Sequence, residues 1–323
     1  MHTSSKKFGI VFDTNAYREL TYGKNTQQAK EYFQVIYKKE DIFGFQAFAT
    51  PLVMLELLSK LADTNDPSYH YHKSAVSALF EHCRLRDIDE EQMAIIADSE
   101  SLLCNSLYRQ QLPIYERGRQ GLAHLCKRVY ESKNIEALSD IQHAFIKLSD
   151  SVKRKKEQFV EDMRSFVIQS LDPEATDWHP LKNNVLRRTK ILKLINNDKY
   201  LRLAAVSQIF RTQLILNIHE TNDEIERKAE FVYEHFKTPL MLYIEILRRI
   251  FTTGCNIDKP KRRNWIWDIQ IAFCLGKGHF ADDRTIVLVT KDKDIVNAAI
   301  SAGIGDQVIT TDKYIRILNE QHF

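Results

Sequence analysis

Glycine and proline are scarce in this chain of 323 residues, which contains 10 glycines and 7 prolines. A protein of average composition and this length has about twice as many. Folds made of many strands and tight turns need both residue types, so a large β-sandwich or propeller is disfavoured. The glycines are also unevenly placed, because residues 122–253 contain none. The two ends of the chain therefore differ in character from its middle.

Long apolar runs and paired cysteines are lacking as well. No run approaches the roughly 18–20 apolar residues that a membrane span needs, and the first residues, MHTSSKKFGIVF, lack a signal-peptide core with a cleavage site. The five cysteines are odd in number and form no CxxC pair, so we expect buried thiols in a cytoplasmic protein that does not bind membranes. They are Cys83, Cys104, Cys126, Cys255 and Cys274.

Several familiar catalytic motifs are missing too. A glycine-rich phosphate loop is absent, which argues against a nucleotide-hydrolysing motor. No nucleophile motif points to Ser/His/Asp or Cys/His catalysis. His70, His72, His82 and Cys83 invite comparison with a zinc site, but HYH lies in a segment expected to be a polar loop and has no standard ligand spacing. We therefore do not expect zinc.

Strand patterns occur at the two ends of the chain only. Apolar runs typical of buried parallel strands cover 8–13, 43–49, 284–290 and 307–311. Helices are predicted after Thr50, an N-cap followed by Pro51, at 264–278 with Asn264 as cap and Gly276 as terminator, at 291–303, and at 312–320. Between 63 and 254 the pattern is helical. The sequence thus predicts an α/β unit with a central parallel sheet, interrupted by a large all-α insertion.

Four acidic residues carry the strongest functional signal. Asp13 ends the first strand and Asp292 follows the strand at 284–290, and ligands of open α/β sheets bind at the carboxyl ends of strands. Glu56 and Asp268 lie on apolar faces of predicted helices, where a carboxylate is costly unless it is paired or bound to a metal. If the four met at one sheet edge, they would form an all-oxygen site suited to Mg²⁺ or Mn²⁺.

Each acid also has a structural explanation. A strand-end aspartate often caps the next helix, and a lone acid in an amphipathic helix is often a boundary residue or a salt-bridge partner. The four together form a more specific pattern than any one of them.

The residues around these acids resemble the four motifs of the PIN-domain nucleases. The segments are VFDTN (11–15), PLVMLELL (51–58), WDIQIAFCLGKG (267–278) and LVTKDKDI (288–295), in that order. The resemblance implies a three-layer α/β/α sandwich with a central parallel sheet, and acids that bind a divalent metal and hydrolyse phosphodiesters, most often in RNA. It covers residues 1–62 and 255–323, which we expect to form one nuclease domain.

The resemblance assigns roles to individual residues. It implies that Asp13, Glu56, Asp268 and Asp292 are the catalytic acids and metal ligands. It gives supporting roles to Asn15, Thr290 and Asp294, and Asp294 could supplement or replace Asp292. The mechanism implied is metal-assisted hydrolysis that leaves a 5′-phosphate and a 3′-hydroxyl.

The spacing departs from compact members of that family. A stretch of about 200 residues separates Glu56 from Asp268, so we expect residues 63–254 to form a helical insertion domain. The resemblance says nothing of its purpose.

Basic residues gather in and beside this insertion. The segment 181–215 is rich in basic residues and contains a single acid, Asp198. Three more basic residues precede the helix of Asp268. Basic stripes suit phosphate backbones, although a solvated helical face is the structural alternative. The expected substrate-binding residues are Arg187, Arg188, Lys190, Lys193, Lys261, Arg262 and Arg263.

We therefore expect a metal-dependent endonuclease acting on RNA rather than DNA, with a possible role as a toxin or in antiviral defence under the control of a partner. The helical insertion would gate the site, select substrate, bind a regulatory protein or join two copies of the chain. Two alternatives remain open. One is a catalytically weak nucleic-acid-binding or partner-docking protein that acts through its helical domain. The other is a metal-dependent phosphatase or another phosphoryl-transfer enzyme on a similar sheet, which is disfavoured because VFDTN lacks the second aspartate of a DxD phosphatase motif.

Overall fold

The chain forms two compact units in the computed structural model, which describes residues 8–86, 92–171, 183–253, 257, 259, 262–276 and 284–320. Unit 1 comprises Met1–Val152 and Cys274–Phe323, and unit 2 comprises Lys153–Phe273. This division differs from the predicted one, in which the helical insertion domain spans residues 63–254. The helices between 69 and 131 group with the sheet because α4 packs on α2, and α6 packs on both α3 and α4.

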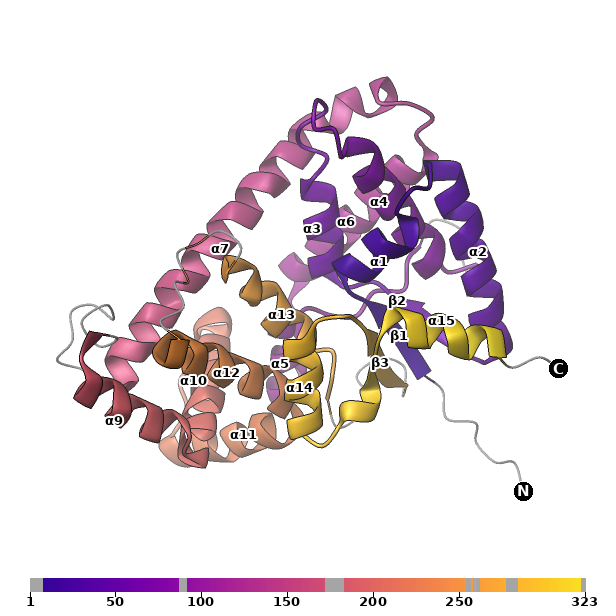
Figure 1. Ribbon diagram of the computed structural model, residues 1–323. Coiled ribbons are helices and arrows are strands. Elements are labelled where there is room, and N and C mark those ends of the chain that lie inside the picture. The colour runs from indigo at the N-terminus through magenta and orange to yellow at the C-terminus, as the bar shows by residue number, and fades with distance from the viewer. Residues whose placement is uncertain are drawn as a thin grey trace. The chain divides into compact units, whose positions relative to one another are not determined.

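Unit 1 contains a sheet of four parallel strands in the order β2-β1-β3-β4 (Figure 1). The strands are β1 (Phe8–Phe12), β2 (Gln46–Phe48), β3 (Thr285–Val289) and β4 (Val308–Ile309), and each lies within one of the predicted apolar runs. Val11 is opposite Phe48 on one side and Leu288 on the other. The mixed α/β architecture, mostly helical with a small parallel sheet, is confirmed.

Helices make up most of the remainder of unit 1. They are α1 (Thr14–Thr21), α2 (Thr26–Ile42), α3 (Pro51–Ser59), α4 (Tyr69–Cys83), α5 (Ser99–Tyr108), α6 (Pro113–Glu131), α7 (Gln142–Leu171, which continues into unit 2), α14 (Lys293–Ser301) and α15 (Thr311–Glu320), with short 3₁₀ turns at Glu136–Ile141 and Gly305–Gln307. Thr50 caps α3 by accepting a hydrogen bond from the Val53 N–H at 3.2 Å, and Pro51 is the first helical residue, as predicted. The HYH segment, expected in a loop, lies in the first turn of α4 instead.

An aromatic cluster at the end of β1 anchors the core of unit 1. The ring of Phe12 packs against Tyr17, Phe33, His82 and Tyr314, with ring centroids 4.7 to 6.2 Å apart. All five side chains are buried. Because Phe12 immediately precedes Asp13, this packing fixes the position of the backbone that carries the first acid.

A buried polar network borders the aromatic cluster. The His82 Nε2 atom lies 2.8 Å from a Glu40 carboxylate oxygen, and the Tyr314 hydroxyl donates to the same oxygen. The other ring nitrogen of His82 lies 2.9 Å from the Tyr17 hydroxyl. His82 is thus bound within the protein core. The thiols of Cys83, Cys104, Cys126 and Cys274 are buried and unbridged, as expected, and Cys255 lies outside the described residues.

Unit 2 is helical throughout its described part. Besides the end of α7 it contains α9 (Val185–Ile195), α10 (Asp198–Leu216), α11 (Asn222–His235), α12 (Lys237–Thr253), a 3₁₀ turn (Arg262–Asn264) and α13 (Trp265–Ala272). The last of these helices ends before the predicted terminator Gly276, because the Phe273 N–H bonds to Gln270 and Ile271 in a tightened final turn. In the part of the chain that is described, no helix has the length and apolar character needed to cross a membrane.

Candidate functional site

The strand order places Asp13 at the topological switch point of the sheet. From β1 the chain goes first to β2 on one side and later to β3 on the other. Ligands of open α/β sheets bind outside the carboxyl ends of the strands at such a switch point. Asp13 directly follows β1, and Thr290 and Asp292 follow β3. The Asp13 N–H also donates to the Val289 carbonyl, which holds the two strand ends together.

Asp13 is a buried carboxylate, with 7% of its surface exposed. It caps α1, because one oxygen accepts a hydrogen bond from the Ala16 N–H, and the other oxygen accepts one from the Thr290 hydroxyl. Burial and, to a smaller extent, the nearby carboxylates of Asp292 and Glu56 raise the pKa of Asp13 to about 6, against the lowering effect of these hydrogen bonds. Asp292 and Glu56 therefore both lie within electrostatic reach of Asp13.

Thr290 connects two of these acids. Its hydroxyl donates to Asp13 and accepts from the Asp292 N–H at 3.0 Å, while its own N–H donates to Ile309 of β4. Thr290 is fully buried, so this arrangement is held firmly by β3 and β4. The Thr290 hydroxyl thus orients the Asp13 carboxylate, and its supporting role in a reaction stays a prediction.

Asp292 caps α14, which is also the structural role considered for strand-end aspartates. Its Oδ1 atom accepts from the N–H groups of Asp294 and Ile295, at 2.8 and 3.1 Å. The cap engages only this oxygen. Asp292 and Asp294 are both half-buried, and Asp294 sits in the first turn of α14.

Glu56 on α3 is held by a residue that sequence reasoning missed. The Thr14 hydroxyl donates to a Glu56 oxygen at 2.7 Å, and Thr14 itself is buried at the start of α1. The adjacent Asn15, expected to support the site, is exposed. A signal was available, because a hydroxyl residue beside the strand-end acid is the natural donor to a second carboxylate that packs against the same helix.

The arrangement in unit 1 is an acidic cluster that lacks the geometry of a formed metal cage. Within the described residues, no three His, Cys, Asp or Glu side chains come together as one metal-binding group. Asp268 lies half-buried on α13 of unit 2, and its proximity to the other three acids stays a prediction.

The predicted substrate-binding residues lie in unit 2 and are mostly exposed. Arg187, Lys190 and Lys193 are exposed on α9, and Arg188 is half-buried there. Arg262 stacks over the Trp265 ring, with its guanidinium carbon 5.2 Å from the ring centroid. Arg263 is half-buried beside it, and Lys261 lies outside the described residues.

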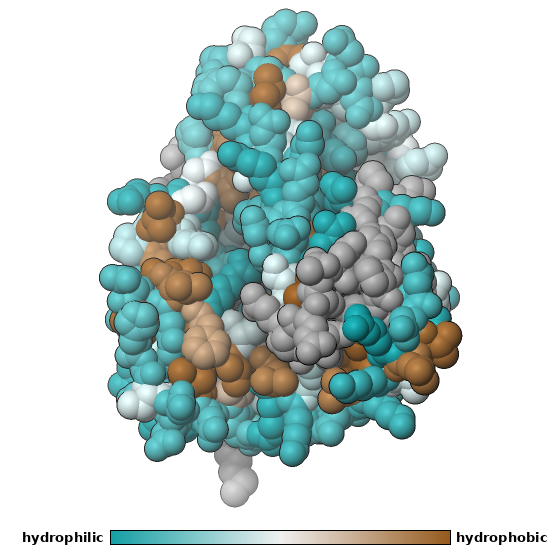
Figure 2. Space-filling view, turned by 90° about the vertical axis from the view of Figure 1, so that its left-hand side faces the viewer, coloured by the Kyte–Doolittle hydropathy of each residue, from teal (hydrophilic) through white to brown (hydrophobic). Residues whose placement is uncertain are grey.

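Exposed apolar side chains accompany these basic residues. Leu203, Phe210 and Leu214 recur along α10 at the spacing of one helix face, and are 46, 51 and 81% exposed. Leu186 on α9 is 84% exposed. Figure 2, which views the side where α9 and α10 appear in Figure 1, shows apolar side chains gathered in strips among hydrophilic ones. This surface, formed by α9 and α10, is the apolar-basic face.

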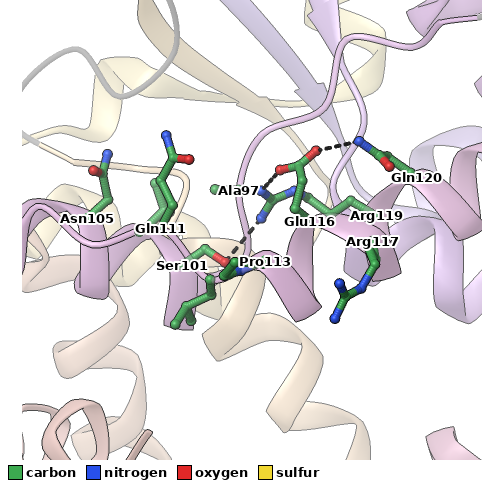
Figure 3. A pocket seen from close by; sticks show the side chains of 11 residues that line it. Ala97, Ser101, Asn105, Gln111, Pro113, Glu116, Arg117, Arg119 and Gln120 are labelled. Carbon is green, nitrogen blue, oxygen red and sulfur yellow. Dashed lines mark hydrogen bonds and ion pairs between the residues drawn. The ribbon is translucent and has the colours of Figure 1, made fainter. Parts of the chain in front are cut away.

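Two adjoining cavities of about 460 and 470 Å³ lie elsewhere in unit 1, along α6, and share Ala97, Glu116, Arg119 and Gln120. In Figure 3 the Glu116 carboxylate lies between Arg119 and Gln120. Arg119 also contacts Asp98, at 3.4 Å, so its charge is balanced by two acids. Asp13, Glu56 and Asp292 do not line either cavity. These cavities therefore contain none of the predicted catalytic acids and carry little net charge that could bind an anion.

Comparisons with protein-family models, with curated proteins and with solved structures find no match for this chain.

Proposed function

We propose that the protein is a metal-dependent endonuclease with a PIN-like arrangement of its sheet and acids, and that RNA is its substrate. The observation that carries this proposal is the buried Asp13 carboxylate at the switch point of the sheet, with the Asp292 and Glu56 carboxylates close to it. Burying one carboxylate beside two others is unfavourable unless a cation compensates the charge.

The donor chemistry of the site fits a hard divalent cation. All its candidate ligands are carboxylate oxygens, the ligands that Mg²⁺ and Mn²⁺ prefer. Mg²⁺ is usually held by one or two carboxylates and keeps several waters, so it does not need a complete protein cage. Asp13, Asp292 and Glu56 would hold the ion. When bound, a divalent cation supplies an acidified water and charge stabilisation for phosphodiester hydrolysis.

The chain's own residues would fix the positions of the ligands. Thr290 orients Asp13, and Thr14 orients Glu56, each through a hydroxyl hydrogen bond. The N-cap of α14 leaves one oxygen of Asp292 outside the cap. Such outer partners commonly contribute 10- to 100-fold to metal affinity or activity.

Cleavage assays with mixed RNA and DNA, with Mg²⁺ or Mn²⁺ and with EDTA, test this proposal. We expect metal-dependent cleavage of RNA that falls at least ~100-fold in Asp13→Asn and about 10- to 100-fold in Thr290→Val. Asp98→Asn is the matched control, because Asp98 is also a helix N-cap but caps α5 outside the acidic cluster. Cleavage that Asp13→Asn leaves unchanged would sink the proposed site.

A second function is favoured by the apolar-basic face. Leucines that are more than four-fifths exposed are unusual on an isolated surface, and they suit a protein partner better than a phosphate backbone. The segment from Asn184 to Leu216 contains many basic residues and one acid, Asp198. Charge complementarity therefore favours an acidic partner. On this view the protein docks a partner through its helical unit.

Affinity capture followed by reconstitution separates the two functions. A docking protein should bind its partner equally well with Asp13→Asn, and should lose it with Phe210→Lys and Leu214→Lys. Exposed Ile300→Lys in unit 1 is the control for a changed apolar surface residue. If the purified partner binds the Phe210 and Leu214 variants as tightly as wild type, the docking function through this face is wrong.

A further inference from the structure

Two helices that leave the acidic cluster each carry a basic residue one turn further on. On α1, Arg18 follows Thr14 by four residues, and at the end of α3, Lys60 follows Glu56 by four. Residues four apart lie on the same helix face, about 6 Å along the axis. Because Thr14 and Glu56 are hydrogen-bonded to each other, Arg18 and Lys60 both lie about one turn from the acids.

The third member of this group is His72, near the start of α4, which packs against α1 and α3. Burial, followed by the charges of Arg18 and Lys60, lowers the pKa of His72 to about 4, and Asp66 opposes this effect. Arg18 and Lys60 therefore both lie close enough to His72 for their charges to act on its ring.

Polar atoms of this group are buried without a hydrogen-bond partner. They are Nε and Nη2 of Arg18 and Nδ1 of His72. A buried donor without a partner is costly, and a guanidinium offers a fork of donors that matches a phosphate. The group has the composition of an anion site that lies beside, and separate from, the acids.

Two exposed tyrosines extend the same surface. Tyr22 ends α1, four residues after Arg18, and Tyr71 precedes His72. They are 79% and 50% exposed, and their rings are stacked, with centroids 6.1 Å apart and planes at 15°. Aromatic rings left in water beside basic groups are typical of surfaces that stack unpaired bases.

We propose that Arg18, Lys60 and His72 hold a phosphate, and that the stacked Tyr22 and Tyr71 hold an unpaired base, of a single nucleic-acid strand that crosses the acidic cluster. This inference rests on the proposed function and names its substrate class, a single-stranded nucleic acid. A duplex is excluded from this mode of binding, because its bases are stacked on each other and their faces are covered.

Fluorescence anisotropy in EDTA, with the full chain, tests the proposal without cleavage. The probes are a labelled single-stranded RNA, the DNA of the same sequence, and the RNA duplex. We expect the single strands to bind more tightly than the duplex. The Tyr22→Ala, Tyr71→Ala double variant should bind RNA about 10- to 100-fold more weakly, whereas the Phe double variant, which keeps both rings, should bind like wild type. A preference between RNA and DNA identifies the natural strand.

The salt dependence of binding tests whether Arg18, Lys60 and His72 hold a phosphate. Lys60→Ala should lower the slope of log K against log salt by about 0.7, the value expected for one phosphate contact in a single strand. Lys147→Ala, at another exposed lysine of unit 1, should leave the slope unchanged. Equal binding of RNA by wild type and the alanine double variant would overturn the inference, as would a wild type that binds no single strand.

A parallel cleavage assay with Mg²⁺ separates this inference from the proposed function. If wild type cleaves RNA and the alanine variants bind RNA as tightly as wild type, the nuclease proposal stands and the proposed binding site is wrong. If the variants lose binding as expected but wild type cleaves no nucleic acid, the strand-binding surface stands and the nuclease proposal fails.

Discussion

At the scale of single residues, the acidic cluster combines a structural role with a functional cost. Asp13 and Asp292 both cap helices, which is sufficient reason for an aspartate at each position. A cap, however, does not require burial, and exposed caps are stabilising. Asp13 is buried beside two other carboxylates, which is unfavourable for the apo protein. That excess cost is what distinguishes Asp13 from an ordinary cap.

Neutralising Asp13 should therefore stabilise the metal-free protein. In EDTA at pH 8 we expect Asp13→Asn to raise the free energy of unfolding by up to about 3 kcal/mol, since a pKa raised from 3.8 to about 6 corresponds to roughly this cost for the charged form. Urea unfolding measures it. Mg²⁺ should stabilise wild type and leave Asp13→Asn unchanged. An Asp13→Asn protein less stable than wild type in EDTA would contradict the argument.

The buried Glu40–His82 pair should make stability depend on pH. Burial alone would lower the pKa of His82, but the charge of Glu40 and hydrogen bonding to Cys83 and Glu40 outweigh it and raise the pKa to about 10. Since the unfolded value is 6.5, the stabilisation is complete below pH 6.5 and is lost as the pH rises to about 10. Urea unfolding at pH 6, 8 and 10 should show a decline on the order of a few kcal/mol.

The His82→Gln variant isolates this effect, because glutamine keeps a hydrogen-bond donor but does not titrate. We expect its stability to change much less between pH 6 and 10 than that of wild type. Tyr17 and Tyr314 contact the pair, but burial raises the pKa of both phenols, so they stay neutral in this range. Parallel pH profiles for the two proteins would show that His82 is not the titrating group.

At the scale of elements, Gly9 is required by the close packing of β1. A Cβ atom there would lie 2.5 Å from Cδ1 of Ile286 and 3.0 Å from a ring carbon of Phe48. We expect Gly9→Ala to destabilise the protein by about 1–3 kcal/mol through overpacking. The matched control is Gly118→Ala in α6, where no atom lies within 4 Å and alanine should stabilise by about 0.5–1 kcal/mol. Thermal unfolding of both variants measures the contrast, and two shifts of the same sign would contradict it.

The elements that the sequence predicted well are those with local signals. The run FGIVF is continuous and apolar, and Thr50 with Pro51 forms a standard helix start, so both could be placed from neighbouring residues alone. The HYH segment was misplaced because its polar composition resembles a loop, whereas the apolar face of α4, which packs on α2, decides its structure.

The contacts of the candidate site were predictable only in part. Asp13, Thr290 and Asp292 follow strands, so the rule for strand ends brought them together. The hydroxyl beside Asp13 marked Thr14 as a hydrogen-bond donor. Its acceptor, Glu56, depends on how α1 packs against α3, which neighbouring residues in the sequence do not specify. Arg18, Lys60 and His72 were missed as a group because they lie on α1, directly after α3 and on α4, and only the packing of these helices brings them together.

At the scale of the whole molecule, unit 2 is a continuous segment inserted into unit 1. Its buried side chains, among them Ile209, Val232, Leu247 and Phe251, lie on helices that pack on one another within the unit. We therefore expect residues 153–273 to fold when expressed alone, with a helical circular dichroism spectrum and cooperative urea unfolding. A Leu247→Asp version of the fragment should be unfolded. A wild-type fragment that melts without cooperativity would show that it depends on unit 1.

The pairing of β1 with β3 also determines when the acidic edge can assemble during synthesis of the chain. Asp13 and Thr290 are 277 positions apart in sequence, and their hydrogen bond joins the two strands whose ends carry the acids. A ribosome that has made β1, β2 and all of unit 2 has still not made β3. The nascent chain therefore lacks an assembled acidic edge until β3 has left the ribosome and paired with β1.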